Sequence, residues 1–261
     1  MLALAACFVA CNDDDSTENL NGTFGDAELY FDNGINGNDL ALGTPYANSN
    51  GETLTINTLN YIISNVVFIK GDGTEYAYPK SDSYFVVNEE TQQLTVHLEA
   101  LPAGDYKKVR FGVGVDDSRY QQGQTAQQDF WNLAVANGLG TNWASGYRFI
   151  AMQGTFTSAS VTNAAAFSVY QNGGNNYREI TLNLPTTARV RHDISPSIHI
   201  KTNINLLLDG TNKVTLGTSL NTAGTQATVD TGNTLTKIAD NTAAVFSVDH
   251  VHNESGDEHE D

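Results

Sequence analysis

The stretch LNYIISNVVFI, residues 59–69, is the most apolar part of the 261-residue chain. Its β-branched and aromatic side chains favour a strand over a helix. The segment that follows it, from Lys70 to Thr74, contains the step Asp72–Gly73, which is typical of a hairpin turn. We therefore expect residues 59–69 to form a central strand of a β-sheet, around which the rest of the chain is arranged.

Short alternating runs on both sides of this stretch predict further strands, separated by turns rich in Gly, Asn and Pro. They lie at residues 27–31, 39–42, 53–56, 84–87, 93–98, 106–115, 166–170, 177–184, 197–207 and 245–248. Helical spacing appears at residues 125–137, which end before Gly138, and a second short helix fits residues 234–244. The pattern predicts an all-β fold: a two-sheet antiparallel β-sandwich with one or two short inserted helices.

The loop and strand LGTNWASGYRFIAMQG, residues 139–154, carry Trp143 at the edge of the predicted sheet. Glycines around it permit backbone angles that other residues avoid. A loop aromatic held by a rigid scaffold can border a functional site, or it can fill a gap in the packing. Both interpretations of Trp143 stay open from the residues alone.

The charge of the chain limits its partners. Thirteen Lys and Arg residues stand against thirty Asp and Glu residues, which gives a formal charge of -17. Such a charge opposes binding to nucleic acid. The sequence contains no G-x-S-x-G elbow, no P-loop and no H-E-x-x-H motif, so we expect a protein that is not an enzyme.

The N-terminus predicts export and lipidation. Both cysteines, Cys7 and Cys11, lie in the first eleven residues, so no disulfide framework can hold the domain together. Residues 8–11, FVAC, resemble a bacterial lipobox with Cys11 as the lipidated residue, and the acidic run after it resembles an export signal for surface lipoproteins. We expect a cell-envelope protein, lipid-anchored to the outer membrane and exposed at the surface. The alternative is a degenerate secretion signal with ordinary cysteines.

These features divide the chain into four parts. Residues 1–11 form a signal and lipobox remnant, and residues 12–24 an acidic flexible tether. The folded domain is expected over residues 25–252, and residues 253–261 form an acidic tail.

The pair His250 and His252 is the strongest candidate for a metal site. Residues two apart on a strand project to the same face, so two imidazoles can bind one ion. Asp249 and His259 could add ligands, and divalent copper or zinc would suit them. The alternative is a polar tail that happens to contain histidines.

Other polar residues favour structural roles. His97 and His199 are expected on strand surfaces, and His192 in a loop beside Asp193. The pair Asp116 and Asp117 could bind calcium, but capping of backbone amides by Asp116 is the favoured interpretation.

Several motifs, taken together, resemble those of the methanobactin-partner, or MbnP-like, family. The strand LNYIISN is similar to the family's LxYYISN pattern, with Gly51 before it and Asp72–Gly73 after it. The motifs LPAGDY (101–106), FGVGVD (111–116) and WASGY (143–147) follow in the same order, and the resemblance covers roughly residues 25 to 250.

The resemblance implies a secreted or surface-held β-sandwich, some members of which bind copper outside the cytoplasm. It further implies a site of histidine imidazoles with a tryptophan at or near it, which a partner dihaem enzyme oxidises to kynurenine. Trp143 matches that tryptophan, but Thr141 stands where many members have a second one. Asn33 and Tyr170 stand where copper-binding members tend to have histidines.

We therefore expect a lipoprotein that binds or presents a metal ion, copper before others, through His250 and His252. Trp143 would border the site and could be the substrate of an oxidising partner protein. The alternative is a surface structural or interaction module that has lost the metal site and binds a protein or glycan.

Overall fold

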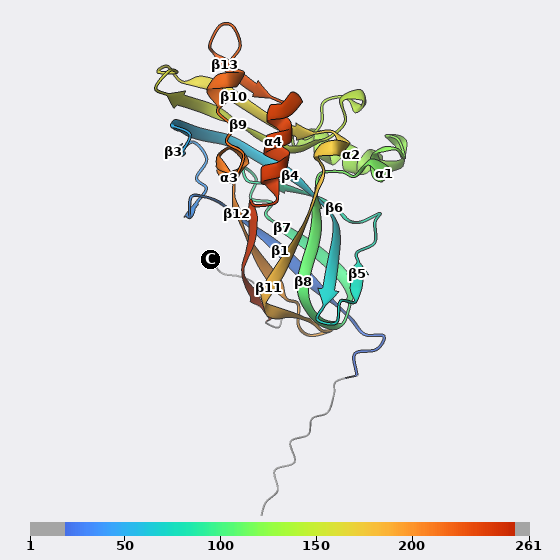
Figure 1. Ribbon diagram of the computed structural model, residues 1–261. Coiled ribbons are helices and arrows are strands. Elements are labelled where there is room, and N and C mark those ends of the chain that lie inside the picture. The colour runs from blue at the N-terminus through green and yellow to red at the C-terminus, as the bar shows by residue number, and fades with distance from the viewer. Residues whose placement is uncertain (1–18, 254–261) are drawn as a thin grey trace, which may run out of the picture.

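The structure, a computed structural model, describes residues 19–253 and consists of two packed β-sheets with four short α-helices in that range (Figure 1). The first sheet has five strands: β1 (Phe24–Ile35), β2 (Asn38–Asp39), β7 (Thr95–Pro102), β12 (Ser197–Asn203) and β14 (Phe246–His252). Two of these, β12 and β14, lie at one side of the sheet in the order β14-β12-β1. The predicted β-sandwich is confirmed.

The second sheet has nine strands. They are β3 (Pro45–Ala47), β4 (Glu52–Lys70), β5 (Glu75–Ala77), β6 (Tyr84–Asn88), β8 (Gly104–Val113), β9 (Arg148–Ser158), β10 (Ala165–Asn172), β11 (Arg178–Val190) and β13 (Gln226–Val229). The helices are α1 (Asp117–Tyr120), α2 (Gln128–Ala136), α3 (Leu206–Asp209) and α4 (Gly232–Thr242). Single 3₁₀ turns form at Thr125–Gln127, Trp143–Ser145, Gly174–Asn176 and Leu216–Ser219.

Strand β4 is the centre of the nine-stranded sheet, as the apolar stretch 59–69 predicts. One edge of β4 pairs with β9 over residues 52–61 and then with β8 over residues 63–70. The opposite edge pairs in turn with the short strands β3, β6 and β5. The side chains of β4 alternate between two faces: Tyr61 and Ile63 lie in the core between the sheets, and Ile62 lies in a separate cluster on the opposite face. Both faces of β4 are therefore covered.

Two strand pairs depart from the expected antiparallel arrangement. Strand β1 pairs with β12 in parallel, and β10 pairs with β13 in parallel. Parallel neighbours need long connections, and here the chain between β1 and β12 builds most of the nine-stranded sheet. The β1 and β12 pairing is what later places Tyr30 beside His199.

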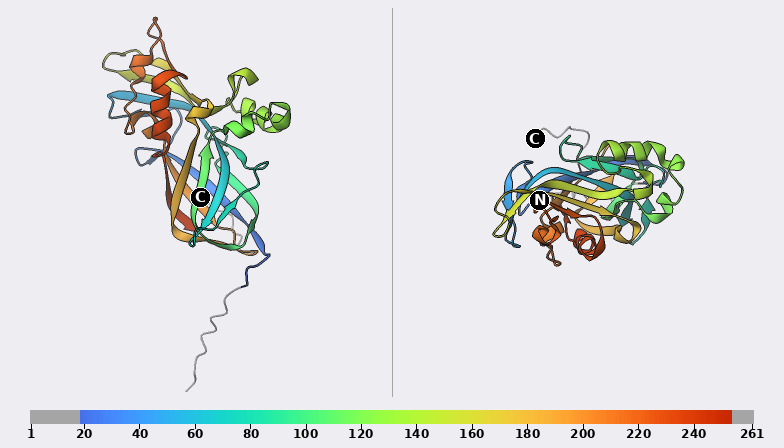
Figure 2. Two further views of the ribbon diagram at one scale, coloured as in Figure 1. Left: turned by 45° about the vertical axis from the view of Figure 1, so that its right-hand side comes forward. Right: turned by 90° about the horizontal axis from the view of Figure 1, so that it is seen from above.

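The helices cover the two faces of the upper part of the nine-stranded sheet. Seen from above, α2 lies on one face and α3 and α4 on the other (Figure 2). Leu207, Leu235 and Ile238 of α3 and α4 join the main core, whereas Trp131 and Ala134 of α2 join the second cluster. The helix expected over residues 125–137 is α2 with its preceding turn, and the one expected over 234–244 is α4. No helix among residues 19–253 is long and apolar enough to cross a membrane.

Candidate metal centre

Three histidines come together on neighbouring strands of the five-stranded sheet. His199 lies on β12, and His250 and His252 lie on β14. The ladder places His199 opposite His250 and Ser197 opposite His252. The ring centroids are 4.2 Å apart for His199 and His250, 5.1 Å for His199 and His252, and 4.5 Å for His250 and His252. One ligand nitrogen from each ring lies within 4.8 Å of the others. We call this group the three-histidine cluster.

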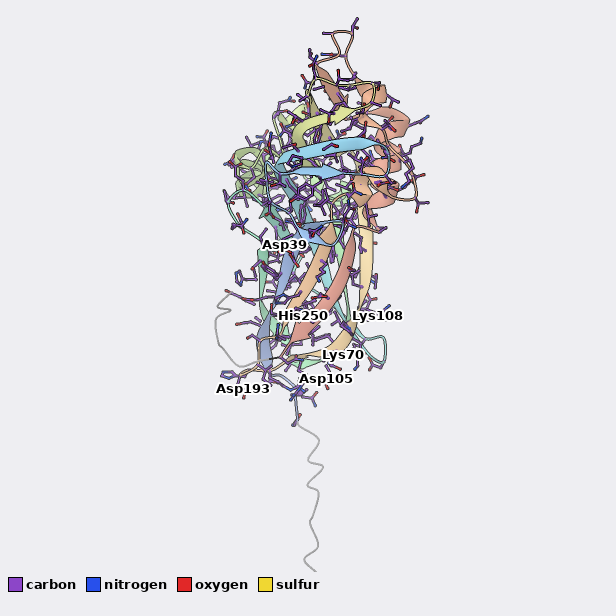
Figure 3. All side chains as sticks on the ribbon, turned by 90° about the vertical axis from the view of Figure 1, so that its left-hand side faces the viewer. Asp39, Lys70, Asp105, Lys108, Asp193 and His250 are labelled. Carbon is purple, nitrogen blue, oxygen red and sulfur yellow. The ribbon has the colours of Figure 1, made fainter. Side chains whose placement is uncertain are left out.

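The cluster lies on the outer face of its sheet, away from the core. Ile198 and Ile200, on either side of His199, are completely buried in the core. Side chains alternate along a strand, so His199 points outward. Each of the three histidines is half-buried. Figure 3 labels His250 and shows it in the lower half of the molecule.

A β-bulge at Asp249 brings the two C-terminal histidines to this face. Ile200 pairs with Val248 and His199 pairs with His250, so Asp249 is the extra residue. Without the bulge, strict alternation would place His250 and His252 on the same side as Val248, which packs against the core. The bulge shifts the alternation by one residue and turns both imidazoles outward.

Asp249 also orients one of the rings. Its Oδ2 atom lies 2.9 Å from Nδ1 of His250, and its Oδ1 atom lies 3.2 Å from Nζ of Lys201. The hydrogen bond with His250, followed by that with Lys201, holds the pKa of the Asp249 carboxyl below its usual range. A carboxylate on Nδ1 keeps the proton there and leaves Nε2 of His250 as the free lone pair. This arrangement is common behind metal-binding histidines.

Two neighbours complete the surroundings of the cluster. The ring of Tyr30, from β1, lies 5.0 Å from the ring of His199. Ser197, opposite His252 in the ladder, is 4% exposed, and its hydroxyl has no hydrogen-bond partner within residues 19–253. A buried hydroxyl in this position can bond to a further ligand of a bound ion.

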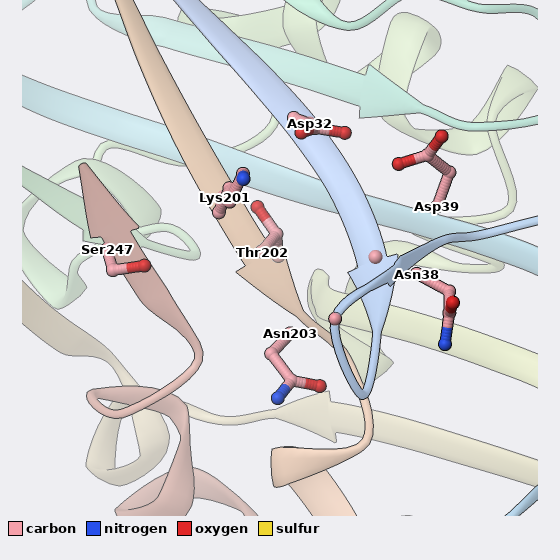
Figure 4. A pocket seen from close by; sticks show the side chains of 9 residues that line it. Asp32, Asn38, Asp39, Lys201, Thr202, Asn203 and Ser247 are labelled. Atoms are coloured by element: carbon pink, nitrogen blue, oxygen red, sulfur yellow. The ribbon is translucent and has the colours of Figure 1, made fainter. Parts of the chain in front are cut away.

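A polar pocket adjoins the cluster along the same sheet. It has a volume of about 230 Å³, and its lining includes Asp32, Asp39, Lys201 and Ser247 (Figure 4). Burial and then the nearby Asp39 raise the pKa of the Asp32 carboxyl. Lys201 links this pocket to the cluster, because it also contacts Asp249.

Trp143 lies elsewhere, among aromatic rings on the nine-stranded sheet. Its ring stacks on Tyr120 at 4.7 Å and meets Trp131 and Tyr147 edge-on at 5.2 Å and 6.0 Å. The hydroxyl of Tyr120 donates to the Trp143 carbonyl oxygen at 2.9 Å. These rings pack with Ile62 on the face of the sheet that points away from the core. We call them, together with Phe130, the aromatic cluster.

The structure therefore does not bring Trp143 to the histidine pair. The expectation that Trp143 borders the site of His250 and His252 is corrected here, because the two lie on the outer faces of different sheets. The aromatic ring beside the three-histidine cluster is Tyr30 instead. The contacts of Trp143 are those of a side chain that fills a gap in the packing.

The two positions where the resemblance implies histidines, Asn33 and Tyr170, make other interactions. Asn33 is buried between the sheets, where its amide donates to Glu89 and its oxygen accepts from Tyr61, both at 2.9 Å. The ring of Tyr170 lies 3.7 Å below the guanidinium of Arg148. Neither position contributes to the three-histidine cluster.

The remaining candidates have structural contacts. Asp116 caps α1 and accepts hydrogen bonds from Asn65, Tyr84 and Lys80, as the capping interpretation predicts. His97 pairs with Glu28 at 2.9 Å. Cys11 and His259 lie outside the described residues.

Sequence reasoning missed three residues that matter: His199, Tyr30 and Trp131. His199 lies on a strand surface, as expected, and the structure adds that it is the third member of the cluster. Its alternation with Ile198 and Ile200 showed an outward position. Only the strand pairing shows which residues share that face.

Comparison with known proteins gives one family. The family model described as MbnP matches residues 24–233. His199 lies within the match, and His250 and His252 lie beyond its end. Among solved structures, MbnP from Methylosinus trichosporium has 12% sequence identity and a TM-score of 0.44, over 73% of this chain and 79% of that chain. No curated protein matches the sequence.

Proposed function

The chain belongs to the MbnP family, and from this premise we propose that it binds a metal ion, copper before others, through His199, His250 and His252. The observation that carries the proposal is the convergence of three imidazoles from two paired strands. Two of the three were expected from the sequence, and the third comes from the neighbouring strand.

The ligand chemistry fits a transition metal. Imidazole suits copper and zinc, and three neutral ligands bind a monovalent or divalent ion without a build-up of negative charge. Metal–nitrogen bonds of about 2 Å place tetrahedral ligands about 3.4 Å apart, so the rings need to close only slightly from their present separation. The charge of -17 on the chain attracts cations to its surface.

The surrounding residues support the same function. Asp249 holds His250 with Nε2 free, and Lys201 holds Asp249 in turn. The Tyr30 ring packs beside His199 and limits the rotation of that imidazole. A bound copper ion would supply a centre that can accept or give one electron. Alternatively, the protein would store the ion and pass it to another protein.

We place this function outside the inner membrane. The proposal rests on the lipobox-like residues 8–11 and the acidic run after Cys11. Growth with a labelled fatty-acid precursor tests it: the wild-type protein should carry the label and a Cys11→Ala variant should not. Label on the variant would overturn the lipid anchor.

Copper titration into the purified protein tests the metal site. We expect the double variant His250→Ala, His252→Ala and the single variant His199→Ala each to lose at least about a hundredfold in affinity. A His97→Ala variant is the matched control, because His97 lies on the same sheet but pairs with Glu28. Equal affinities in the wild type and the double variant would end the proposal.

The competing function is an interaction module without a metal. The observations that favour it are Asn33, Thr141 and Tyr170, which stand at positions where the family resemblance implies other residues. Elemental analysis of protein made with copper supplementation and its own export route separates the two. Metal well below one ion per chain, with no mass change on Trp143, would favour the interaction module.

A further inference from the structure

A second pocket lies beside the loop that carries Trp143, and the metal site does not use it. It has a volume of about 230 Å³, and its lining includes Val115, Asp117, Tyr120, Tyr147 and Phe149, with the loop residues around Gly146 and Gly174. We call it the loop pocket. We propose that the loop pocket binds a small organic cation, such as a quaternary ammonium or a protonated amine with a compact apolar body.

The aromatic walls of the loop pocket are fixed by contacts behind them. Tyr120 stacks on Trp143 and donates its hydroxyl to the Trp143 carbonyl oxygen. The hydroxyl of Tyr147 donates to Oε1 of Gln127 at 2.9 Å. Because both hydroxyls are already bonded within the protein, these rings offer a ligand only their carbon surface. The π faces attract cations, whereas the ring edges do not.

Phe149 is the third wall, and a glycine sets its position. A Cβ atom on Gly114 would lie 2.3 Å from Cγ of the Phe149 ring, so only glycine lets that ring lie against the strand. The φ angle of Gly114 is +108°, which other residues rarely adopt. The backbone at Gly114 therefore helps to fix the position of the Phe149 ring.

Asp117 supplies the charge. It is the one charged residue in the lining of the loop pocket, and within residues 19–253 its carboxylate makes no hydrogen bond or ion pair. Its neighbour Asp116, in contrast, accepts from Asn65, Tyr84 and Lys80. A Cβ atom on Gly174 would lie 1.8 Å from Oδ1 of Asp117, so glycine leaves room for the carboxylate there.

The combination selects a class of ligand. A carboxylate beside aromatic rings attracts a positive charge, and aromatic walls prefer a weakly hydrated cation to a metal ion. An anion would meet the unpaired Asp117 and the negative charge of the chain. A neutral ligand of the same shape would keep the apolar contacts and lose the charge attraction.

Choline and its uncharged isostere 3,3-dimethyl-1-butanol make the test. Tryptophan fluorescence follows binding, because Trp143 stacks directly on the Tyr120 wall. We expect saturable binding of choline with a dissociation constant below about 10 mM. The isostere should bind at least about tenfold more weakly. Asp117→Asn should lower choline affinity by a similar factor, whereas Glu179→Gln, an exposed acid on β11, should not.

The variant His250→Ala, His252→Ala separates this site from the metal centre, since it should bind choline like the wild type. Equal affinity for choline and the isostere in the wild-type protein would overturn the proposal. So would unchanged choline binding in a folded Asp117→Asn protein, or no saturation by choline. The isostere comparison uses the wild-type chain and holds even if a variant does not fold.

Discussion

The two outer faces of the sandwich carry different residues. The outer face of the five-stranded sheet is polar and open, and it displays the three-histidine cluster, Tyr30 and the ion pairs around Asp249. The corresponding face of the nine-stranded sheet is covered by α2 and the Trp143 loop, which bury the aromatic cluster. Side chains alternate along the strands in the same way on both faces. A face becomes buried only where a further segment, here α2 and the Trp143 loop, covers it.

This difference separates stability from binding. Trp131 and Tyr147 are 5% and 2% exposed, so their removal should act mainly on folding. The three histidines are half-buried and add little apolar burial, so their removal should act mainly on metal affinity. Substitutions in the aromatic cluster should leave the metal affinity unchanged, and substitutions of the three histidines should leave the stability nearly unchanged.

The largest expected effect is on the aromatic face. Trp131→Ala removes a buried indole that contacts Trp143 and Tyr147, and it should lower the free energy of unfolding by about 3–5 kcal/mol. Urea denaturation measures this loss. Leu133→Ala, on the same helix but 40% exposed, is the matched control and should cost less than about 1 kcal/mol. A copper affinity that changed in folded Trp131→Ala protein would contradict the separation of the two faces.

A deletion of Asp249 is the sharpest test of the histidine face. It removes the extra residue and leaves Val248 and His250 as consecutive partners of Ile200 and His199, so both imidazoles should keep their outward direction. Copper affinity should then fall only by about tenfold, because the carboxylate on His250 is lost. Asp249→Asn keeps the extra residue and loses only the carboxylate on His250, so its affinity should fall by about tenfold.

The informative result of a copper titration is the ratio of the copper affinities of the two Asp249 variants. Similar losses in the deletion and in Asp249→Asn are expected, whereas a loss of a hundredfold or more in the deletion alone would contradict the pairing of His250 with His199. Circular dichroism confirms that both variants keep their strands before the affinities are compared.

Acid should loosen the aromatic face through Asp116, and this is the smallest expected effect. Burial by itself would raise the pKa of Asp116, but hydrogen bonds from Asn65, Ser118, Tyr84 and Lys80 outweigh it and hold the pKa well below its usual range. A carboxyl with a lowered folded pKa adds stability above its unfolded pKa of about 3.9, and that stability is lost as the pH falls below it.

Asp116→Asn should therefore cost about 2 kcal/mol at neutral pH and progressively less below about pH 4. Urea denaturation at several pH values measures the difference from the wild type. Glu99→Gln, an exposed acid in β7, is the control and should show little effect at any pH. A cost for Asp116→Asn that stayed constant down to pH 2 would show that its charge is not what stabilises this face.

Much of the fold could be predicted from the sequence because its signals are local. The apolar run 59–69 becomes the C-terminal part of β4, and Gly138 follows the predicted helix that becomes α2. The capping role of Asp116 follows from its place at the end of a strand before a short helix. The parallel pairing of β1 with β12 could not be predicted, because it joins segments about 170 residues apart.

The candidate site shows the same division. By itself, the sequence determined that two imidazoles, His250 and His252, share one face of a strand, because side chains alternate with a period of two. Tertiary structure alone decided which face that is. The bulge at Asp249 turns the pair outward, and the pairing of β14 with β12 adds His199. Pairing between distant strands leaves no periodic mark in the chain, so the third ligand and the distance to Trp143 are properties of the fold.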